Sequence, residues 1–123
     1  MVGNIKAPLE ETEQRALVQW LRLKKISHFS VGNENVHSFL NRDLAVKMQG
    51  KAKAMGAVKG VSDMVILLDR CVLFIELKRA DRSLSKVSKE QTKFIDMVNG
   101  LEYAHGAVCY GYLNAIEFIE GYL

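Results

Sequence analysis

The chain has 123 residues, of which 49% are hydrophobic and 25% are charged, and its formal net charge is +3. This composition is typical of a soluble globular protein, and we expect one domain spanning residues 1–123. It excludes a transmembrane helix, because no apolar run approaches the ~20 residues that a membrane span needs. The N-terminus lacks the apolar core of a signal peptide, and Cys71 and Cys109 lie in apolar runs typical of buried thiols. We therefore expect a cytoplasmic protein.

Residues 9–25 are predicted to form an amphipathic helix, because apolar side chains recur there at helical spacing. Its first turn carries Glu10, Glu11 and Glu13, which complement the helix dipole. On a helical wheel Glu10 lies at the edge of the apolar stripe and Glu13 lies inside it. We therefore expect one of these two carboxylates to face the sheet. The stripe consists of Leu9, Ala16, Leu17, Trp20 and Leu21.

Residues 26–31 alternate in the manner of a β-strand, and a strongly basic stretch follows at residues 41–60. This stretch is too rich in glycine for a good helix throughout. Two interpretations of its charge are open: a solvated basic face, or a surface that contacts the backbone phosphates of a nucleic acid next to the cation site. The cations are Arg42, Lys47, Lys51, Lys53 and Lys59, against the single acid Asp43.

The centre of the chain, residues 60–78, is predicted to form a β-hairpin. Two short apolar runs, rich in β-branched and aromatic residues, flank the polar pair Asp69-Arg70. With the turn centred on that pair, Asp63 lies directly opposite Glu76, with Cβ atoms roughly 5 Å apart on one face. Lys78 points to the same face, because strand side chains alternate. Asp-Arg is not a favoured tight-turn pair, and an odd slip of register would put the carboxylates on opposite faces.

The pairing of Asp63 with Glu76 indicates a cation site. Like charges directly opposite each other destabilise a sheet, whereas a divalent cation between the carboxylates would turn this repulsion into binding. Oxygen-only ligands suit Mg²⁺, with Mn²⁺ as a substitute, better than zinc. A purely structural interpretation is also open, in which Asp63 or Glu76 pairs with Lys78.

The last third of the chain predicts a helix at residues 88–100 and a strand at residues 107–112. Ser88 opens the helix, with Gln91 at the capping-box position. The strand–helix–strand unit predicts a parallel, right-handed crossover. A final helix is expected after Asn114 as its N-cap. A hydrophobic staple would support its start, formed by Leu113 and Phe118.

These elements predict an α/β fold with a mixed central sheet, in the order αβββαβ, flanked by helices. One face of the hairpin carries the charged residues together with Val65 and Phe74, and the other face carries Ile66 and Leu73. Both faces hold apolar side chains, so helices should cover both. The charged cluster then lies at one end of the central hairpin.

The order Asp63, then Glu76-Leu77-Lys78, resembles the PD-(D/E)xK nuclease motif. More narrowly, nearly the whole chain is similar to a stand-alone VRR-NUC domain of the phage and bacterial type. This resemblance implies a restriction-endonuclease-like core, in a protein that is nucleoid-associated or phage-encoded in a bacterial host. The motifs that carry it include Glu10-x-x-x-Gln14, Asn33-Glu34, Gly60-Val61-Ser62-Asp63 and Val108-Cys109-Tyr110-Gly111.

The resemblance also implies roles for individual residues. Lys78 would orient or activate the attacking water, and Gln91 matches a glutamine that the family carries near the site, so capping and catalytic roles are both open for it. Glu13 occupies a position that the family usually fills with an apolar residue, and we assign the helix carboxylate to Glu10. The catalytic residues would be Asp63, Glu76, Lys78 and Gln91. The metal ligands would be Glu10, Asp63, Glu76 and the backbone carbonyl of Leu77.

The function implied by the resemblance is a Mg²⁺-dependent endonuclease that cuts branched DNA, such as four-way (Holliday) junctions, as a homodimer. A domain this small has little surface for base readout, which favours recognition of DNA shape and backbone. Two alternatives are a nuclease acting on flap or linear DNA, and a nucleic-acid-binding module without catalysis. The expected contacts with DNA are Lys47, Lys51, Lys53 and Lys59.

Overall fold

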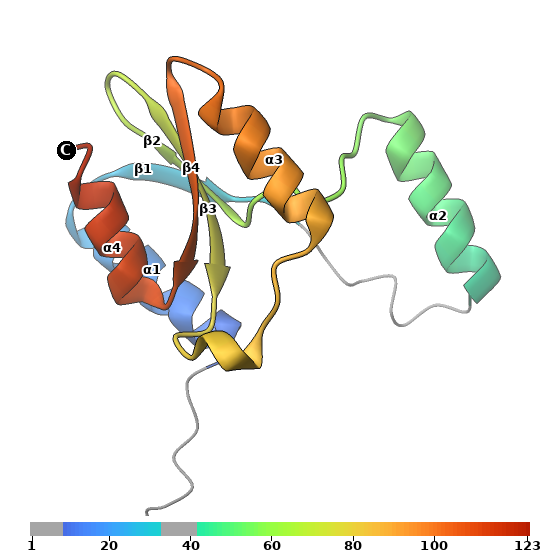
Figure 1. Cartoon of the computed structure of the whole chain (residues 1–123), viewed down its shortest axis with the longest axis horizontal. Helices are drawn as coiled ribbons and strands as arrows, with labels where there is room; N and C mark the ends of the chain where they lie inside the picture. The colour runs from blue at the N-terminus through green and yellow to red at the C-terminus, as the bar shows by residue number, and fades with distance from the viewer. Residues whose placement is uncertain (1–8, 33–41) are drawn as a thin grey trace, which may run out of the picture.

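The computed structural model describes residues 9–32 and 42–123, which form a mixed sheet with helices on both sides (Figure 1). The helices are α1 (Glu10–Leu23), α2 (Arg42–Ala54), α3 (Lys89–Asn99) and α4 (Tyr112–Glu120), with a short 3₁₀ helix, η3 (Arg82–Leu84). The strands are β1 (Ser27–Ser30), β2 (Met64–Leu67), β3 (Val72–Lys78) and β4 (Ala104–Tyr110). No helix in these ranges is long and apolar enough to cross a membrane.

The sheet has the order β1-β2-β3-β4. Strands β1, β2 and β3 pair antiparallel, and β4 pairs with β3 in parallel, as the predicted crossover through α3 requires. Helices α1 and α4 lie together on one face, and α3 covers the other (Figure 1). The predicted α/β fold with a mixed, helix-flanked sheet is confirmed.

The hairpin of β2 and β3 has the predicted register. Met64 pairs with Ile75, and Leu67 pairs with Val72. The turn closes with a hydrogen bond of 3.0 Å from the Leu68 amide to the Cys71 carbonyl, on either side of the polar pair that the sequence placed there. The odd slip that would have separated the carboxylates is therefore excluded.

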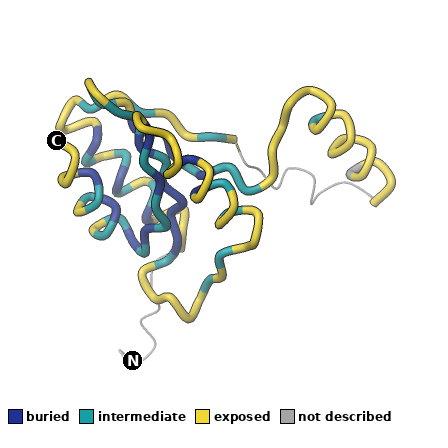
Figure 2. The backbone as a smooth tube through the Cα atoms, turned by 45° about the horizontal axis from the view of Figure 1, so that its top comes forward, coloured by how far each residue is buried: buried dark blue, intermediate teal, exposed yellow. Residues whose placement is uncertain are grey.

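The alternation of strand side chains builds two apolar layers. On the face of α1 and α4 the side chains of Ile66 and Leu73 are fully buried against Leu17. On the opposite face Phe74 packs edge-on against Phe94 of α3, with ring centroids 5.6 Å apart. Figure 2 shows the most buried backbone in the central strands and in α1 and α4. The core therefore holds β3 rigidly, and β3 carries Glu76 and Lys78.

Helix α3 starts as predicted. Ser88 is its N-cap, Gln91 completes the capping box, and Gly100 is its C-cap. Its C-terminal end is tied to β4, because the Asn99 side chain exchanges two hydrogen bonds with the backbone of Gly106, of 2.8 and 3.0 Å. These bonds fix the C-terminal end of α3 against β4.

The start of the last helix differs from the prediction. Helix α4 begins at Tyr112 with Gly111 (φ 86°) at its N-cap, whereas Asn114 lies inside the helix and accepts a hydrogen bond from the Tyr110 amide. The predicted staple is also wrong, because Leu113 is 67% exposed. Strand β4 correspondingly runs from Ala104 to Tyr110, earlier than predicted. The reason is that a carboxylate from α1, described below, satisfies the first amide of α4.

The basic stretch forms a helix over most of its length. Residues Arg42–Ala54 are helical although Gly50 lies among them, and the helix stops before Gly56, whose φ is +100°. Figure 1 shows α2 standing apart from the sheet and its covering helices, and Figure 2 shows it mostly exposed. The expectation that this stretch would not be helical throughout is confirmed, because residues 55–60 lie outside the helix.

The link from α2 to β2 runs directly against the first turn of α3. Gly60 has a φ of +85°, and a Cβ atom at this position would lie 2.3 Å from the backbone carbonyl of Glu90 and 2.7 Å from the Gln91 amide. Only glycine fits such a close approach. The contact holds the link before β2 beside Gln91, which completes the capping box of α3.

Replacing Gly60 with alanine should therefore lower the free energy of unfolding by roughly 2 kcal/mol, through steric overlap and an unfavourable φ. Gly50→Ala is the matched control, because a Cβ there meets nothing within 4 Å. Urea denaturation of the two variants measures the difference. Equal stability of both variants would contradict the close packing at Gly60.

Candidate active site

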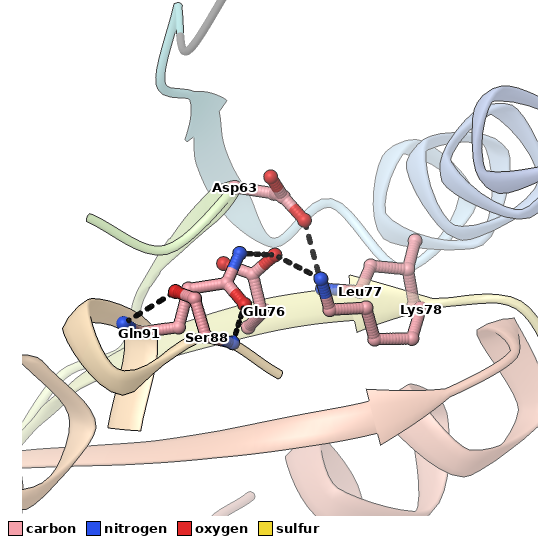
Figure 3. A network of polar contacts seen from close by, with 6 residues as sticks. All are labelled: Asp63, Glu76, Leu77, Lys78, Ser88 and Gln91. Carbon is pink, nitrogen blue, oxygen red and sulfur yellow. Dashed lines mark hydrogen bonds and ion pairs between the residues drawn. The ribbon is translucent and has the colours of Figure 1, made fainter. Parts of the chain in front are cut away.

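Two charged residues of β3 and one residue at the entrance of β2 come together at one end of the hairpin (Figure 3). Asp63 precedes β2, and its backbone carbonyl accepts a hydrogen bond of 2.8 Å from the Val31 amide, which ties it to the end of β1. The Oδ2 atom of Asp63 accepts a hydrogen bond of 2.9 Å from the Leu77 amide on the neighbouring strand. The aspartate is thereby directed toward β3, beside Glu76 and Lys78.

Glu76 is the most enclosed member of this group, at 2% exposure. Its Oε2 atom accepts a hydrogen bond of 3.0 Å from Nε2 of Gln91 and lies 3.5 Å from Nζ of Lys78. Its Oε1 atom is buried and has no hydrogen-bond partner among the described residues. Buried polar atoms are nearly always paired, so an unpaired carboxylate oxygen at this position points to a ligand.

Burial raises the pKa of Glu76 to about 8, and the nearby charge of Asp63 adds to the rise. The Lys78 ammonium group acts in the opposite direction and lowers this pKa. The sum means that the protein disfavours a negative charge on Glu76 unless further positive charge is supplied. A pair of carboxylates held in this way is suited to a cation.

Gln91 closes the capping box of α3 and also contacts Glu76, whereas its catalytic role stays a prediction. Its Oε1 atom accepts from the Ser88 amide at 2.9 Å, and its own amide donates to Ser88 Oγ at 3.1 Å, which closes the capping box. Its side-chain NH₂ group donates to Glu76. Because the oxygen is used by the cap, the amide can present only its nitrogen to the carboxylate, so the start of α3 orients Glu76.

The two carboxylates of α1 lie in different environments. Glu10 is exposed, whereas Glu13 is 4% exposed. Oε1 of Glu13 accepts a hydrogen bond of 2.9 Å from the Tyr112 amide, at the first turn of α4. The sheet-facing carboxylate is therefore Glu13, and its oxygen is used to anchor α4. The assignment of Glu10 as a metal ligand stays a prediction.

The donor set at the hairpin consists of oxygen atoms. Within residues 9–32 and 42–123, no three side chains of His, Cys, Asp or Glu gather closely enough to hold a metal ion, so Glu10 does not join Asp63 and Glu76. What remains is two carboxylates, with the Leu77 carbonyl as the predicted third ligand. Such a set fits a hard divalent cation that keeps several water ligands, as Mg²⁺ does. The unpaired Glu76 oxygen is consistent with this fit.

Comparison with solved structures gives a likeness over nearly the whole chain. A structure described as a VRR_NUC domain protein matches with a TM-score of 0.72, covering 95% of this chain and 89% of the other, at 22% sequence identity. The chain has the fold of a VRR_NUC domain protein. No protein-family model and no curated protein sequence matches it significantly. The likeness therefore rests on three-dimensional structure.

Within this VRR-NUC fold, the predicted DNA-binding lysines of α2 lie away from the carboxylates (Figure 1). Lys47, Lys51 and Lys53 are exposed on α2, and Lys59 is exposed in the link that follows it. Figure 1 shows α2 apart from the end of the hairpin. The motif Asn33-Glu34 lies outside the described residues. The sequence thus predicted the carboxylates and the lysine of the hairpin as one group, whereas the basic helix is a separate surface.

The raised pKa of Glu76 predicts that the metal-free protein loses stability as the pH rises. Between the ordinary value of 4.5 and the folded value of about 8, the folded chain holds a proton that the unfolded chain has released. Stability therefore falls through this interval. Glu76→Gln removes this ionisation, so from about pH 5 to about pH 9 its free energy of unfolding should rise relative to wild type by roughly a few kcal/mol.

Urea denaturation in the presence of EDTA, repeated across this pH range, measures the effect. Glu102→Gln is a suitable control, because Glu102 is exposed in the turn before β4. A difference between Glu76→Gln and wild type that stays constant with pH would contradict the raised pKa.

Proposed function

We propose that this protein is a nuclease of the VRR-NUC type, which hydrolyses phosphodiester bonds in DNA with the help of Mg²⁺. The observation that carries the proposal is the meeting of Asp63, Glu76 and Lys78 around a buried carboxylate oxygen without a partner. The VRR-NUC fold supports it, since the resemblance in sequence and the likeness in structure point to the same class of protein. The proposed substrate is DNA.

In this proposal Asp63, Glu76 and the Leu77 carbonyl hold the cation. Glu10 of α1 does not gather with these two carboxylates in this structure, and as a further ligand it would have to approach them when the cation binds. Mg²⁺, or Mn²⁺ in its place, would supply a polarised water molecule and positive charge next to the phosphate. Gln91 holds one oxygen of Glu76 by a hydrogen bond of 3.0 Å and so leaves Oε1 for the cation. The raised pKa of Glu76 shows that its negative charge is unfavourable in the protein alone, so a bound cation would stabilise the ionised form.

Lys78 has a separate role in the proposal. Its side chain is 8% exposed, and its ammonium group lies 3.5 Å from Glu76 Oε2, which places the positive charge beside the carboxylates. From this position it orients the attacking water and stabilises the negative charge that develops on the phosphate. A lysine held in this way contributes positive charge without moving when the substrate binds.

The preferred DNA in this proposal is branched, with four-way junctions as the leading candidate, and the protein acts as a homodimer. A dimer would bring two active sites to two strands of one junction. The exposed cations of α2, Lys47, Lys51 and Lys53, would contact phosphates outside the active site. Recognition of shape and backbone suits a domain with so little surface for base readout.

Cleavage of labelled linear, flap and four-way DNA, with Mg²⁺ or with EDTA, tests the proposal. We expect nicking of the four-way junction in preference to linear duplex, only with Mg²⁺. Glu76→Ala and Lys78→Ala should each lower the rate by at least about a hundredfold, since each removes a group at the reacting phosphate. Glu10→Gln tests the helix carboxylate in the same assay.

Asp69→Asn is the matched control, because Asp69 is an exposed acid at the opposite end of the hairpin. Equal cutting of linear and four-way DNA would remove the branched substrate and leave the nuclease. DNA binding without cleavage of any substrate would contradict the proposal and favour a binding module in which the hairpin charges are structural. Light scattering of the purified protein tests the homodimer.

A further inference from the structure

An arginine and a tyrosine lie in contact beside the candidate active site. The guanidinium carbon of Arg82, in η3, lies 4.3 Å from the centre of the Tyr110 ring at the end of β4. Tyr110 pairs with Lys78 in the parallel register of β3 and β4. Neither Arg82 nor Tyr110 is among the predicted site residues.

The register puts Tyr110 on the same face of the sheet as the charged group. Paired residues on adjacent strands project to the same side, and residues two apart on one strand share that side. Glu76, Lys78 and Tyr110 therefore project from one face, on neighbouring strands. Arg82 covers the Tyr110 ring and so lies at the border of the candidate active site, next to Lys78.

The position of Arg82 is fixed from both ends of its side chain. At the backbone, Asp81 Oδ1 accepts hydrogen bonds from the amide and the hydroxyl of Ser83, of 2.9 and 2.7 Å, which hold the turn of η3. At the other end, the guanidinium group rests on the aromatic ring. A guanidinium held on a ring has already lost part of its conformational freedom before any ligand binds.

Arg82 keeps its hydrogen-bond donors available. Within the described part of the chain its contact is the Tyr110 ring, and it forms no ion pair with a carboxylate. The neighbouring acid, Asp81, is engaged with Ser83. A guanidinium group whose planar N–H donors face solvent is suited to bidentate binding of a phosphate.

The segment that carries Arg82 is strongly basic. Residues 79–89, which run from the end of β3 to the first residue of α3, contain four cations and one acid. Unlike the lysines of α2, this segment starts immediately after Lys78 and ends at the helix that orients Glu76. The cations are Arg79, Arg82, Lys86 and Lys89.

We propose that Arg82, held in place by Tyr110, binds a backbone phosphate of DNA. This phosphate is adjacent to the reacting phosphate, which would lie at Lys78 and at the cation held by Glu76. This inference rests on the proposed function for the identity of the ligand. It adds a substrate-positioning contact on the β4 side of the active site, at the opposite side of Lys78 from Asp63. The tyrosine contributes by fixing the guanidinium plane, so Tyr110→Phe should preserve the contact and Tyr110→Ala should weaken it.

Fluorescence anisotropy with a labelled four-way junction, in EDTA so that cleavage does not interfere, measures the contact. Arg82→Ala should weaken binding about tenfold at low salt, which is typical of losing one charged hydrogen-bonding group. The slope of log affinity against log salt should become shallower by about 0.9, as expected for one phosphate contact. Arg82→Lys should recover only part of the affinity, because lysine cannot bind in the bidentate manner.

Arg70→Ala is the matched control, since it removes the same charge from the exposed turn at the far end of the hairpin. It should leave affinity nearly unchanged. Equal losses in Arg82→Ala and Arg70→Ala, or wild-type affinity in Arg82→Ala, would overturn the inference. Circular dichroism melting of each variant checks that the fold is intact.

Adding Mg²⁺ to the same samples separates this inference from the proposed function. If wild-type protein binds DNA, loses affinity in Arg82→Ala and cleaves nothing, the nuclease proposal fails while the phosphate contact is supported. If wild-type protein cleaves DNA and Arg82→Ala binds as Arg70→Ala does, the phosphate contact alone is overturned.

Discussion

The pairing of β2 with β3 is the constraint on which the site depends. The register that pairs Met64 with Ile75 brings Asp63 to the level of Glu76 and Leu77, and the Asp63 carboxylate accepts a hydrogen bond from the Leu77 amide. Two acids at neighbouring positions repel each other, and burial makes the repulsion stronger. A sheet selected only for stability would avoid this arrangement. The fold instead surrounds the pair with partners that reduce its cost without removing it.

Those partners come from three separate parts of the chain. Lys78 supplies positive charge from the same strand, and Gln91 supplies a hydrogen bond from the start of α3. Gly60 allows the link before β2 to lie directly on the first turn of α3, which sets the distance between that helix and the hairpin. One oxygen of Glu76 stays unpaired in this arrangement. The same contacts that hold the strands together therefore leave one atom open for a cation.

The elements that depend on local pattern could be predicted from the sequence. The register of β2 and β3 was predicted correctly from a turn centred on the polar pair Asp69-Arg70 between two apolar runs. An odd slip stayed open at that point, because both faces of the hairpin carry apolar side chains. The capping box of Ser88 and Gln91 spans three residues and was also predicted. The sequence could not decide whether Gln91 also contacts the site. Its hydrogen bond to Glu76 joins α3 to β3, and the relative position of these two elements depends on packing.

The predictions that were wrong concern features that depend on contacts between residues far apart in the sequence. Asn114 has the composition of an N-cap, but Glu13 bonds the Tyr112 amide from a position 99 residues away in the chain, and α4 therefore begins earlier. Nothing near Asn114 indicates this partner. The sequence could not decide in the same way whether Glu10 or Glu13 faces the sheet. A helical wheel shows which residues share a stripe, but it does not show which carboxylate will accept a hydrogen bond from another helix. The only local signal was that Glu13 lies inside the apolar stripe.

Isothermal titration calorimetry of the full chain with Mg²⁺ tests whether Asp63 and Glu76 hold a cation. We expect wild type and Asp69→Asn to bind Mg²⁺ with the same affinity, whereas Asp63→Asn and Glu76→Gln should bind it far more weakly. The control removes an acid from the same hairpin at its exposed turn, so general loss of negative charge is accounted for. If Asp63→Asn and Glu76→Gln bind Mg²⁺ as wild type does, or if wild type binds neither Mg²⁺ nor Mn²⁺, the paired carboxylates are not a metal site.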